Sequence, residues 1–315
     1  MNTRPSSTLL EQAGRNLKGK TVVITGATSG IGLAATKIMA GYGAFVIGIG
    51  RSEQKCRMAE TEIRELHADA KIAYLTADLS LLREVRKLAE KIKETVHKEG
   101  NDCIDVLVNN AGTFACWYIS TEEGFELQFA VNYLAPFLLT YELLPLLKAA
   151  STGRIINLSS GSHYRTKIRW NDIMMRKHYN CLMAYKQTKL ANVLFTAELN
   201  RRLGKYHRSN KTQDSCINIR AFVVDPGLVN TQIGFKGTTG IVKWIWKMRS
   251  QRGIEPEEAA STIIYLAGDP NVLNSQEIYW KNCHPLKPSK YSQREDVALR
   301  LWEMTEQMCG IRWEN

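Results

Sequence analysis

Short apolar runs alternate along this chain with longer segments in which apolar residues recur at helical spacing. The first run, at 21–25, precedes a helical pattern at 30–42. Runs this short indicate buried strands, and strands that alternate with helices indicate a parallel sheet covered by helices on both faces. The later predicted strands are 44–50, 71–76, 104–109, 154–158, 217–224 and 277–280, and the later helices are 53–67, 81–98, 122–149, 184–203, 256–267 and 293–308.

This alternation predicts a single α/β domain. A chain of 315 residues could hold one large α/β domain or two small ones. No Pro-, Gly- or Ser-rich linker and no internal repeat interrupts the pattern, so we expect one domain at 18–310 with about seven strands. Residues 1–17 are predicted to form an N-terminal arm or a short leading helix, and residues 161–183 an irregular segment.

A glycine-rich turn, Gly26-Ala27-Thr28-Ser29-Gly30-Ile31-Gly32, joins the first strand to the first helix. In a dinucleotide site, Gly26 allows a sharp turn, Gly30 lets backbone approach a pyrophosphate, and Gly32 lets the helix pack closely on the sheet. The start of the helix then offers free N–H groups to the phosphates. A plain strand-to-helix turn is the alternative, and the strand before and the helix after favour the dinucleotide.

Composition bears on the compartment and the partners. Seven scattered cysteines without a C-x-x-C spacing argue for free thiols in a reducing compartment, and against a zinc site. The formal net charge is +11, and eleven Lys or Arg lie between Arg201 and Gly253 against two Asp. A basic face attracts anionic lipid, nucleic acid or a phosphorylated cofactor, or is simply solvated. No nucleic-acid motif accompanies it, so nucleic acid is not an expected partner.

The N-terminal residues lack the apolar centre of a signal peptide. No apolar run reaches the ~18 residues that a bilayer-spanning helix needs. We therefore expect a cytoplasmic protein. A transit peptide is the alternative that the basic N-terminal residues leave, although the segment is short and contains Glu11.

The end of the second strand predicts which cofactor binds. In dinucleotide folds an acid at this position binds the ribose 2′-hydroxyl, whereas an Arg accommodates a 2′-phosphate. Here Gly50 stands where the acid would be, and Arg51 follows. The sequence therefore favours NADP(H) over NAD(H), because a guanidinium pairs well with phosphate. An ordinary surface Arg is the alternative.

Tyr185 and Lys189 lie four residues apart on a predicted helix, and so share one face. A phenol, with a pKa of ~10, is a poor base at neutral pH. A neighbouring ammonium and an oxidised nicotinamide both favour the phenolate. Tyr185 could then exchange a proton with a substrate oxygen while hydride moves at the adjacent carbon. The alternative is a solvated Tyr–Lys pair.

Two further polar positions complete the predicted catalytic set. Ser160 follows the fifth strand, where a hydroxyl can hold the same substrate oxygen. Ser159 and Ser162 are rivals, and each of these serines could instead cap a turn. Asn132 lies in an otherwise apolar helix, where a buried amide must be bonded. It either anchors a water that links Lys189 to solvent or bonds only to backbone.

Taken together, these motifs resemble the short-chain dehydrogenase/reductase family over residues 18–310. The resemblance implies a Rossmann-type fold and hydride transfer with a nicotinamide cofactor. It rests on T-G-x-x-x-G-I-G at 25–32, Asp78-Leu79, N-N-A-G at 109–112, the set Asn132, Ser160, Tyr185 and Lys189, and P-G-x-x-x-T at 226–231. The cofactor-binding positions that it implies are Gly26, Thr28, Ser29, Gly30, Ile31, Gly32, Arg51, Asp78, Leu79, Asn109, Ala111, Gly112, Tyr185, Lys189, Pro226, Gly227, Val229 and Thr231.

Within that family, the segment 185–196 and the long interval from Ser160 to Tyr185 look like retinol dehydrogenases and their relatives. The resemblance implies a lipophilic substrate, that is, a retinoid-, steroid- or lipid-like alcohol, aldehyde or ketone. Many retinoid enzymes carry an N-terminal membrane anchor, and this sequence departs from them in that respect.

The stretch 230–253 mixes apolar and basic side chains, among them Trp244 and Trp246. In the family that the motifs resemble, this region covers the substrate site, so the resemblance implies a substrate lid. An interfacial helix on an anionic membrane and a core helix with snorkelling lysines are the alternatives. The whole sequence predicts an NADP(H)-dependent oxidoreductase. A homodimer and peripheral contact with an intracellular membrane are left open, and a fold-retaining binding or regulatory protein without turnover is the alternative.

Overall fold

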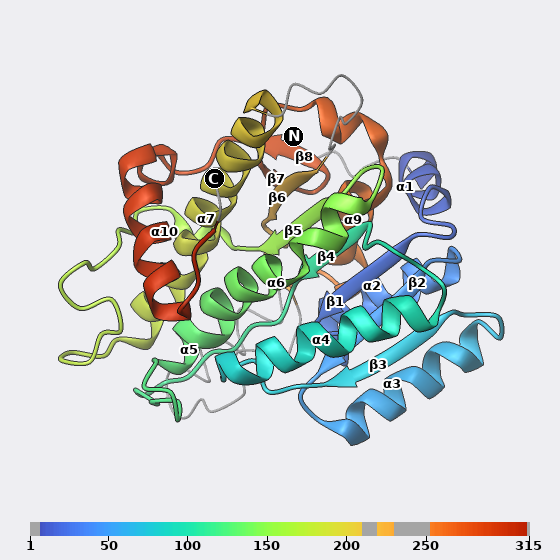
Figure 1. Cartoon of the computed structure of the whole chain (residues 1–315), viewed down its shortest axis with the longest axis horizontal. Coiled ribbons are helices and arrows are strands. Elements are labelled where there is room, and N and C mark those ends of the chain that lie inside the picture. The colour runs from blue at the N-terminus through green and yellow to red at the C-terminus, as the bar shows by residue number, and fades with distance from the viewer. Residues whose placement is uncertain (1–6, 210–218, 230–252, 314–315) are drawn as a thin grey trace.

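The computed structural model describes residues 7–209, 219–229 and 253–313. Within them, eight strands form one sheet in the order β3-β2-β1-β4-β5-β6-β7-β8, and only β7 and β8 pair antiparallel (Figure 1). The chain winds outward from β1 in both directions, which confirms the predicted doubly wound α/β sheet. The strands are β1 (Thr21–Thr25), β2 (Phe45–Gly50), β3 (Ile72–Thr76), β4 (Val106–Asn109), β5 (Arg154–Leu158), β6 (Arg220–Val224), β7 (Tyr279–Lys281) and β8 (His284–Leu286).

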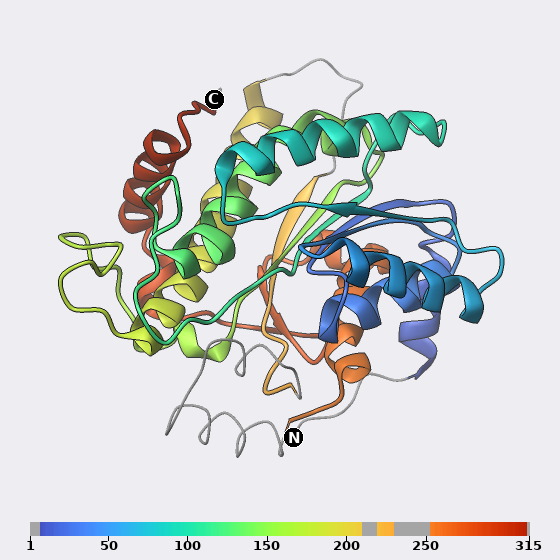
Figure 2. The ribbon, with the colours of Figure 1, turned by 90° about the horizontal axis from the view of Figure 1, so that it is seen from below.

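Helices cover both faces of this sheet, as Figure 2 shows. Helices α4, α6, α7 and α10 contribute to the apolar core on one face, and α2, α3 and α9 to the core on the other, where α1 packs on α9. Alternate residues of β1 enter the two cores, Val23 in the first and Val22 in the second. A strand buried on both faces reads as a continuous apolar run. The helices are α1 (Ser7–Arg15), α2 (Gly30–Gly41), α3 (Glu53–Leu66), α4 (Leu82–Lys98), α5 (Leu127–Phe129), α6 (Ala135–Ala149), α7 (Cys181–Ser209), α9 (Pro256–Gly268) and α10 (Glu295–Cys309).

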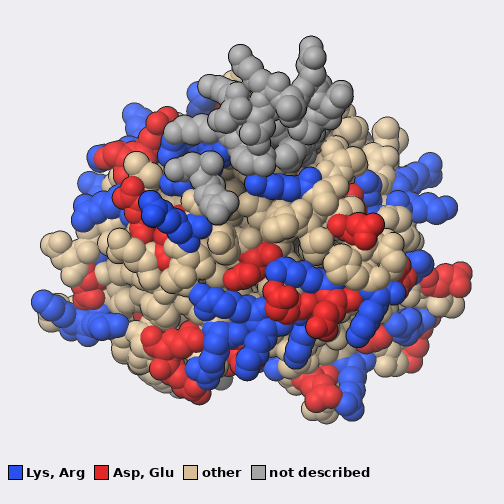
Figure 3. Space-filling view, viewed as in Figure 1, with Lys and Arg blue, Asp and Glu red and all other residues tan. Residues whose placement is uncertain are grey.

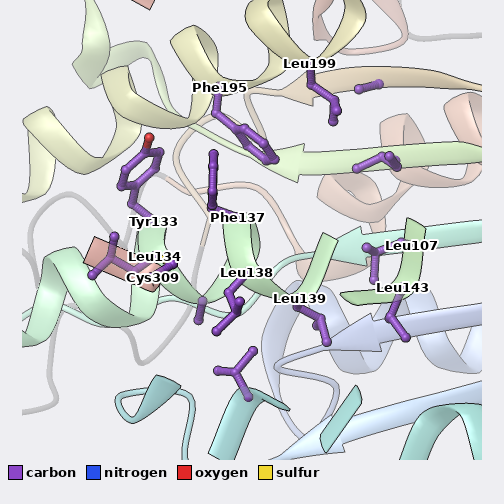
Figure 4. Packing of buried hydrophobic residues seen from close by; sticks show 14 of the residues in the cluster. Leu107, Tyr133, Leu134, Phe137, Leu138, Leu139, Leu143, Phe195, Leu199 and Cys309 are labelled. Carbon is purple, nitrogen blue, oxygen red and sulfur yellow. The ribbon is translucent and has the colours of Figure 1, made fainter. Parts of the chain in front are cut away.

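Aromatic side chains join α6 and α7 to the C-terminal helix α10. The Phe137 ring lies 5.1 Å from Phe195 and 5.0 Å from Trp302, measured between ring centroids. Phe137 points from α6 toward Phe195 on α7, and Tyr133 lies beside it (Figure 4). The buried Tyr133 hydroxyl shares a 2.8 Å hydrogen bond with Thr305 of α10. This packing holds α7, which carries the predicted catalytic pair, rigidly against the sheet.

The predicted helix at 122–149 begins later than the sequence indicates. α5 starts at Leu127, and the Glu126 carboxylate accepts the Phe129 N–H at 2.8 Å as its cap. Glu123 lies outside the helix because its carboxylate caps α4, accepting the N–H groups of Leu82 and Arg83 at 2.6 and 3.1 Å. The helix is also interrupted by a π-helical turn at Ala130–Leu134.

The hairpin from β7 to β8 is absent from the sequence-based expectation. Asn282 and Cys283 form its turn with φ angles of 50° and 59°, in the left-handed region that Asn tolerates better than most residues. The residues are Asn-Cys rather than the Asn-Gly that marks such turns most clearly, so the pattern is hard to read. β7 itself lies at 279–281, against a predicted 277–280.

One helical stretch among the described residues, Leu127–Ala149, is long and apolar enough to cross a bilayer. In its most apolar window 67% is buried inside the protein, where α6 packs against the sheet and beside α4. On the face seen in Figure 3, Lys and Arg side chains are interspersed with Asp and Glu. Most of the basic stretch between Arg201 and Gly253 lies outside the described residues.

Replacing Glu123 by Ala should destabilise the fold. The change leaves two N–H groups at the start of α4 without an acceptor, and loss of a helix cap costs about 0.5–2 kcal/mol. Glu122→Ala is the matched control, because the exposed Glu122 pairs with exposed Arg83, and exposed pairs contribute ~0–1 kcal/mol. Urea unfolding of both variants measures the difference. Equal free energies of unfolding would contradict the capping role.

Candidate active site

A cavity of about 960 Å³ opens where the parallel strands end. Its walls come from the segments that follow β1 to β6, because the carboxyl ends of parallel strands meet at one edge of a sheet. Of the predicted site residues that the structure describes, only Asn109 and Asn132 are not among those that line this cavity. Thr231 and all of the predicted lid at 230–253 except Gly253 lie outside the residues that the structure describes.

The glycine turn forms the floor of one end of the cavity. Gly26 has a φ of 69°, which favours glycine, and a Cβ placed on Gly32 would lie 2.2 Å from the Gly26 carbonyl oxygen. Helix α2 therefore rests directly on the turn. Ser29 precedes the helix without a capping bond from its side chain. The first N–H groups of α2 stay available to an anion in the cavity.

Asn110 belongs to the N-N-A-G motif, although it is not among the predicted cofactor-binding positions. Its Nδ2 donates to the carbonyl oxygens of Thr25 and Gly26 at 2.8 and 3.2 Å, so it ties the glycine turn to the end of β4. Asn109 lies deeper, where its Nδ2 donates to Asn157 Oδ1 at 2.8 Å. Successive side chains of a strand point to opposite sides, so the two asparagines of N-N-A-G bond to different parts of the fold.

Gly50 and Arg51 lie at the other end of the cavity. A Cβ on Gly50 would come within 2.5 Å of Thr28 Cγ2 and 2.6 Å of Cys56 Sγ, so an acidic side chain fits there only if its neighbours move. Arg51 is exposed and lines the cavity. Asp78 also lines it, and its Oδ1 accepts the Ser80 N–H at 3.0 Å.

Tyr185 and Lys189 face the cavity from α7. The Lys189 Nζ lies 5.4 Å from the centroid of the Tyr185 ring and donates to the Leu158 carbonyl oxygen at 3.2 Å. Burial lowers the pKa of Lys189 to about 8. Burial, with the charge of Asp225 as a smaller cause, raises the pKa of Tyr185 above its ordinary value. The phenol is therefore protonated in the free protein and can act as a proton donor.

The three candidate serines have different surroundings. Ser159 is buried, and its hydroxyl donates to the Lys189 carbonyl oxygen at 2.8 Å. Ser160 lines the cavity, and its Oγ accepts the Ser162 N–H at 3.2 Å, so it also caps a 3-10 turn at Gly161–His163. The buried Ser162 Oγ has no partner among the described residues. The Ser160 hydroxyl, which lines the cavity and still has its proton to donate, thus stays available to a substrate oxygen, whereas the Ser162 Oγ is buried.

The Asn132 side chain is bonded to backbone and to a neighbouring hydroxyl. It accepts the Thr113 N–H at 2.7 Å and donates to the Thr113 carbonyl at 3.0 Å and to Thr188 Oγ1 at 3.2 Å. Its backbone carbonyl lies in the π-helical turn and accepts from Asn192 Nδ2 at 3.0 Å. Sequence reasoning missed Asn192. Its position one helical turn after Lys189 is the only sequence feature that indicates a place near the catalytic pair.

Comparison with known proteins agrees with this geometry. The family model described as short chain dehydrogenase matches residues 20–239. The chain belongs to the short-chain dehydrogenase family. Membership makes the protein an oxidoreductase of the class that acts on CH–OH groups with a nicotinamide cofactor. The residues present fit such a cofactor, because Gly26, Gly30 and Gly32 of the glycine turn line the cavity and the start of α2 has no side-chain cap, which leaves its first N–H groups for the phosphates.

The relatives by sequence are named retinol dehydrogenases. Human retinol dehydrogenase 13 is 35% identical over 306 residues, covering 94% of this chain and 86% of that protein. Mouse retinol dehydrogenase 12 is 34% identical over 300 residues, covering 95% of this chain and 89% of that protein. This short-chain dehydrogenase is therefore retinol dehydrogenase-like, as its sequence predicts.

Solved structures share the fold. An uncharacterised protein from Mycobacterium paratuberculosis superposes with a TM-score of 0.70 at 28% identity, covering 96% of this chain and 98% of the other. A short chain dehydrogenase from Escherichia coli CFT073, solved with NADPH, gives a TM-score of 0.62 at 22% identity, covering 85% of this chain and 98% of the other.

Within the described residues of this chain, no three His, Cys, Asp or Glu side chains gather as a metal site.

Replacing Lys189 by Met should stabilise this dehydrogenase at neutral pH. The folded protein releases the Lys189 proton near pH 8, whereas the ordinary value is 10.5. Below pH 8 the buried charge therefore costs about 3 kcal/mol, and the cost disappears as pH rises from 8 to 10.5. The Leu158 carbonyl oxygen still accepts a hydrogen bond after the change, because Asn192 Nδ2 also donates to it at 3.0 Å.

We expect the free energy of unfolding at pH 7 to rise by about 2–3 kcal/mol in Lys189→Met, and the gain to shrink toward pH 10.5. Denaturant unfolding across this pH range measures it. Lys186→Met is the control, since Lys186 lies on the same helix but is only half-buried, and it should change stability by less than about 0.5 kcal/mol. A gain independent of pH would contradict the buried-charge argument.

Proposed function

We propose that the protein is an NADP(H)-dependent oxidoreductase for a lipophilic alcohol, aldehyde or ketone. One observation carries the proposal: a single cavity holds Tyr185, Lys189 and Ser160 at the ends of β5 and α7, and Arg51 at the end of β2. A proton-transfer pair and a phosphate-binding cation on one cavity are what a reaction between a carbinol carbon and a phosphorylated dinucleotide needs.

The preference for NADP(H) is supported by Gly50 and Arg51. The crowding of Thr28 and Cys56 around Gly50 disfavours the acid that would bind the 2′-hydroxyl of NAD(H). The exposed guanidinium of Arg51 can form charge-assisted hydrogen bonds with a 2′-phosphate. The first N–H groups of α2 and the backbone of the glycine turn would hold the pyrophosphate.

The nicotinamide, when bound, supplies or accepts the hydride. The chain's own residues handle the proton and the substrate oxygen. The Ser160 hydroxyl holds that oxygen, and the Tyr185 hydroxyl donates its proton to it during reduction and takes the proton back during oxidation. The Lys189 ammonium beside the ring stabilises the phenolate that remains. Its hydrogen bond to the Leu158 carbonyl keeps the ammonium in place.

A lipophilic substrate is supported by the rim of the cavity. Leu182 and Leu228 line the cavity and are 42% and 50% exposed, which is high for large apolar side chains. Two such residues at the entrance favour an apolar molecule over a sugar or a small acid. The names of the relatives, retinol dehydrogenases 12 and 13, also support this substrate class.

A reducing, cytoplasmic compartment is part of the proposal, and the free state of the six described cysteines supports it. Peripheral contact with an intracellular membrane and a homodimer stay predictions of the sequence.

Replacing Tyr185 by Phe should abolish turnover while leaving cofactor binding intact, because only the transferable proton is removed. We expect kcat to fall by about 10²-fold or more, the usual scale of general acid–base catalysis. NADPH oxidation with a panel of retinoids, steroids and simple carbonyls measures turnover, and quenching of protein fluorescence measures cofactor binding.

Tyr141→Phe is the matched control, since Tyr141 does not line the cavity and its hydroxyl donates to the Arg312 carbonyl at 3.4 Å. Turnover near the wild-type value in Tyr185→Phe would overturn the proton-donor role. Wild-type protein that binds NADPH and turns over no carbonyl in the panel would instead favour a binding or regulatory protein.

Replacing Arg51 by Ala should weaken NADPH far more than NADH, because only NADPH carries the 2′-phosphate. A charge-assisted hydrogen bond of about 1.5–3 kcal/mol corresponds to a loss of roughly ten- to a hundredfold in affinity. Fluorescence titration with both cofactors gives the two dissociation constants. Arg57→Ala is the control, because Arg57 is exposed on α3, pairs with Glu53 and does not line the cavity. Equal weakening of both cofactors would contradict the assignment.

A further inference from the structure

His163 is a buried imidazole that none of the steps above uses. It ends the 3-10 turn at Gly161–His163, directly after Ser160, and has no exposed surface. Its ring lies 4.1 Å from the Tyr164 ring and 4.9 Å from the Tyr279 ring of β7, between centroids. A fully buried imidazole must have both nitrogens bonded, so its partners tell what it does.

Both ring nitrogens have a backbone partner. The Ser289 N–H lies 3.1 Å from His163 Nε2, and the Ser160 carbonyl oxygen lies 2.9 Å from Nδ1. A backbone N–H can only donate and a carbonyl can only accept. Nε2 must therefore be the bare nitrogen, and Nδ1 must carry the proton that it donates to Ser160. The partners thus determine the tautomer of a neutral ring.

This arrangement joins the predicted catalytic serine to a distant part of the chain. The Ser160 carbonyl also accepts the His163 backbone N–H at 3.1 Å, so one residue holds it twice. Ser289 follows β8, and the neighbouring Tyr164 hydroxyl donates to the Lys287 carbonyl at 2.6 Å. Two adjacent side chains therefore clamp the Ser160 turn onto the segment after β8.

We propose that His163 is a positioning residue for Ser160: as a neutral ring it bridges the Ser160 carbonyl to the Ser289 amide and so holds the Ser160 hydroxyl in place on the cavity wall. This inference rests on the proposed function, because it concerns the serine that would hold the substrate oxygen. Protonation of Nε2 replaces its lone pair with an N–H that faces the Ser289 N–H, and the bridge breaks at that side.

The surroundings favour the neutral ring at neutral pH. Burial lowers the pKa of His163 below its ordinary value, against smaller opposing effects of the Ser160 carbonyl and Asp225. Asp225 faces the ring from the end of β6, and its charge is partly balanced by Lys281 of β7, whose Nζ lies 3.6 Å away. Tyr164 and Tyr279 pack on the ring as neutral phenols, since burial raises the pKa of each. The exposed Lys287 and Lys290 flank Ser289.

Three substitutions separate the two bonds of the ring. His163→Asn keeps a donor near the position of Nδ1, for Ser160, and loses the acceptor for Ser289. His163→Gln keeps an acceptor near the position of Nε2, for Ser289, and loses the donor. His163→Phe keeps the ring contacts and loses both bonds. His178→Asn is the matched control, since His178 is exposed on the same connecting segment.

We expect the Gln and Phe variants to lose about tenfold or more in kcat with NADPH affinity unchanged, because a catalytic group displaced by ~1 Å can cost up to ~10²-fold. The Asn variant should show a similar loss, because, like protonation of Nε2, it breaks the bond to Ser289 and keeps only the donor for Ser160; all three variants should melt at lower temperature. Wild-type kcat should fall as pH decreases below about 6.5, and this acid limb should be missing from the Asn variant.

If all three variants melt earlier with kcat and its pH profile unchanged, His163 is only structural and the inference is overturned. ¹⁵N-histidine NMR of the wild-type protein reads the tautomer without any turnover, and an Nε2–H ring, or a protonation midpoint above 6.5, would also overturn it. Wild-type protein that turns over none of the carbonyls would overturn the proposed function, and the role of His163 with it. The outcomes above overturn the role of His163 alone, so the two failures can be told apart.

Discussion

The backbone carbonyl of Leu158, at the end of the central strand β5, is the point on which the catalytic end of the cavity depends. It accepts hydrogen bonds from Lys189 Nζ and from Asn192 Nδ2, both on α7. Asn192 Nδ2 also donates to the Asn132 carbonyl in the π-helical turn. One strand end, one helix and one helix irregularity are thereby held in a fixed relation. The Tyr185 ring can be aimed at the cavity only because α7 cannot rotate or slide against β5.

Holding a charge at that point works against the stability of the fold. Lys189 is buried with one backbone carbonyl and one aromatic ring as its described partners and no carboxylate. A structural lysine would be paired with an acid or exposed, because a buried ammonium with only neutral partners is expensive. Functional sites often carry such locally unfavourable groups, which the rest of the core must offset. Here the aromatic packing of Phe137, Phe195 and Trp302 behind α7 has that effect.

The fold and the chemical positions of the site follow from local sequence patterns. Buried strands, the glycine turn and the Tyr185–Lys189 spacing each depend on residues close together in the chain, so the sequence alone predicts them. The start of α5 does not, because Glu123 leaves that helix to cap α4, about forty residues earlier in the chain. The roles of Asn109, Asn110 and Asn192 also depend on which strand or helix lies opposite each side chain. Such contacts are set by tertiary packing, which periodicity does not encode.

The β7–β8 hairpin also decides how the sheet ends. β8 is three residues long, and its middle residue, Pro285, has no N–H to donate. An edge strand of this kind is a poor template for a further strand from another chain. Extension of the sheet at this edge is therefore disfavoured, and so is a continuous sheet formed by two copies of the protein through β8. The same device protects the protein from edge-to-edge aggregation on that side.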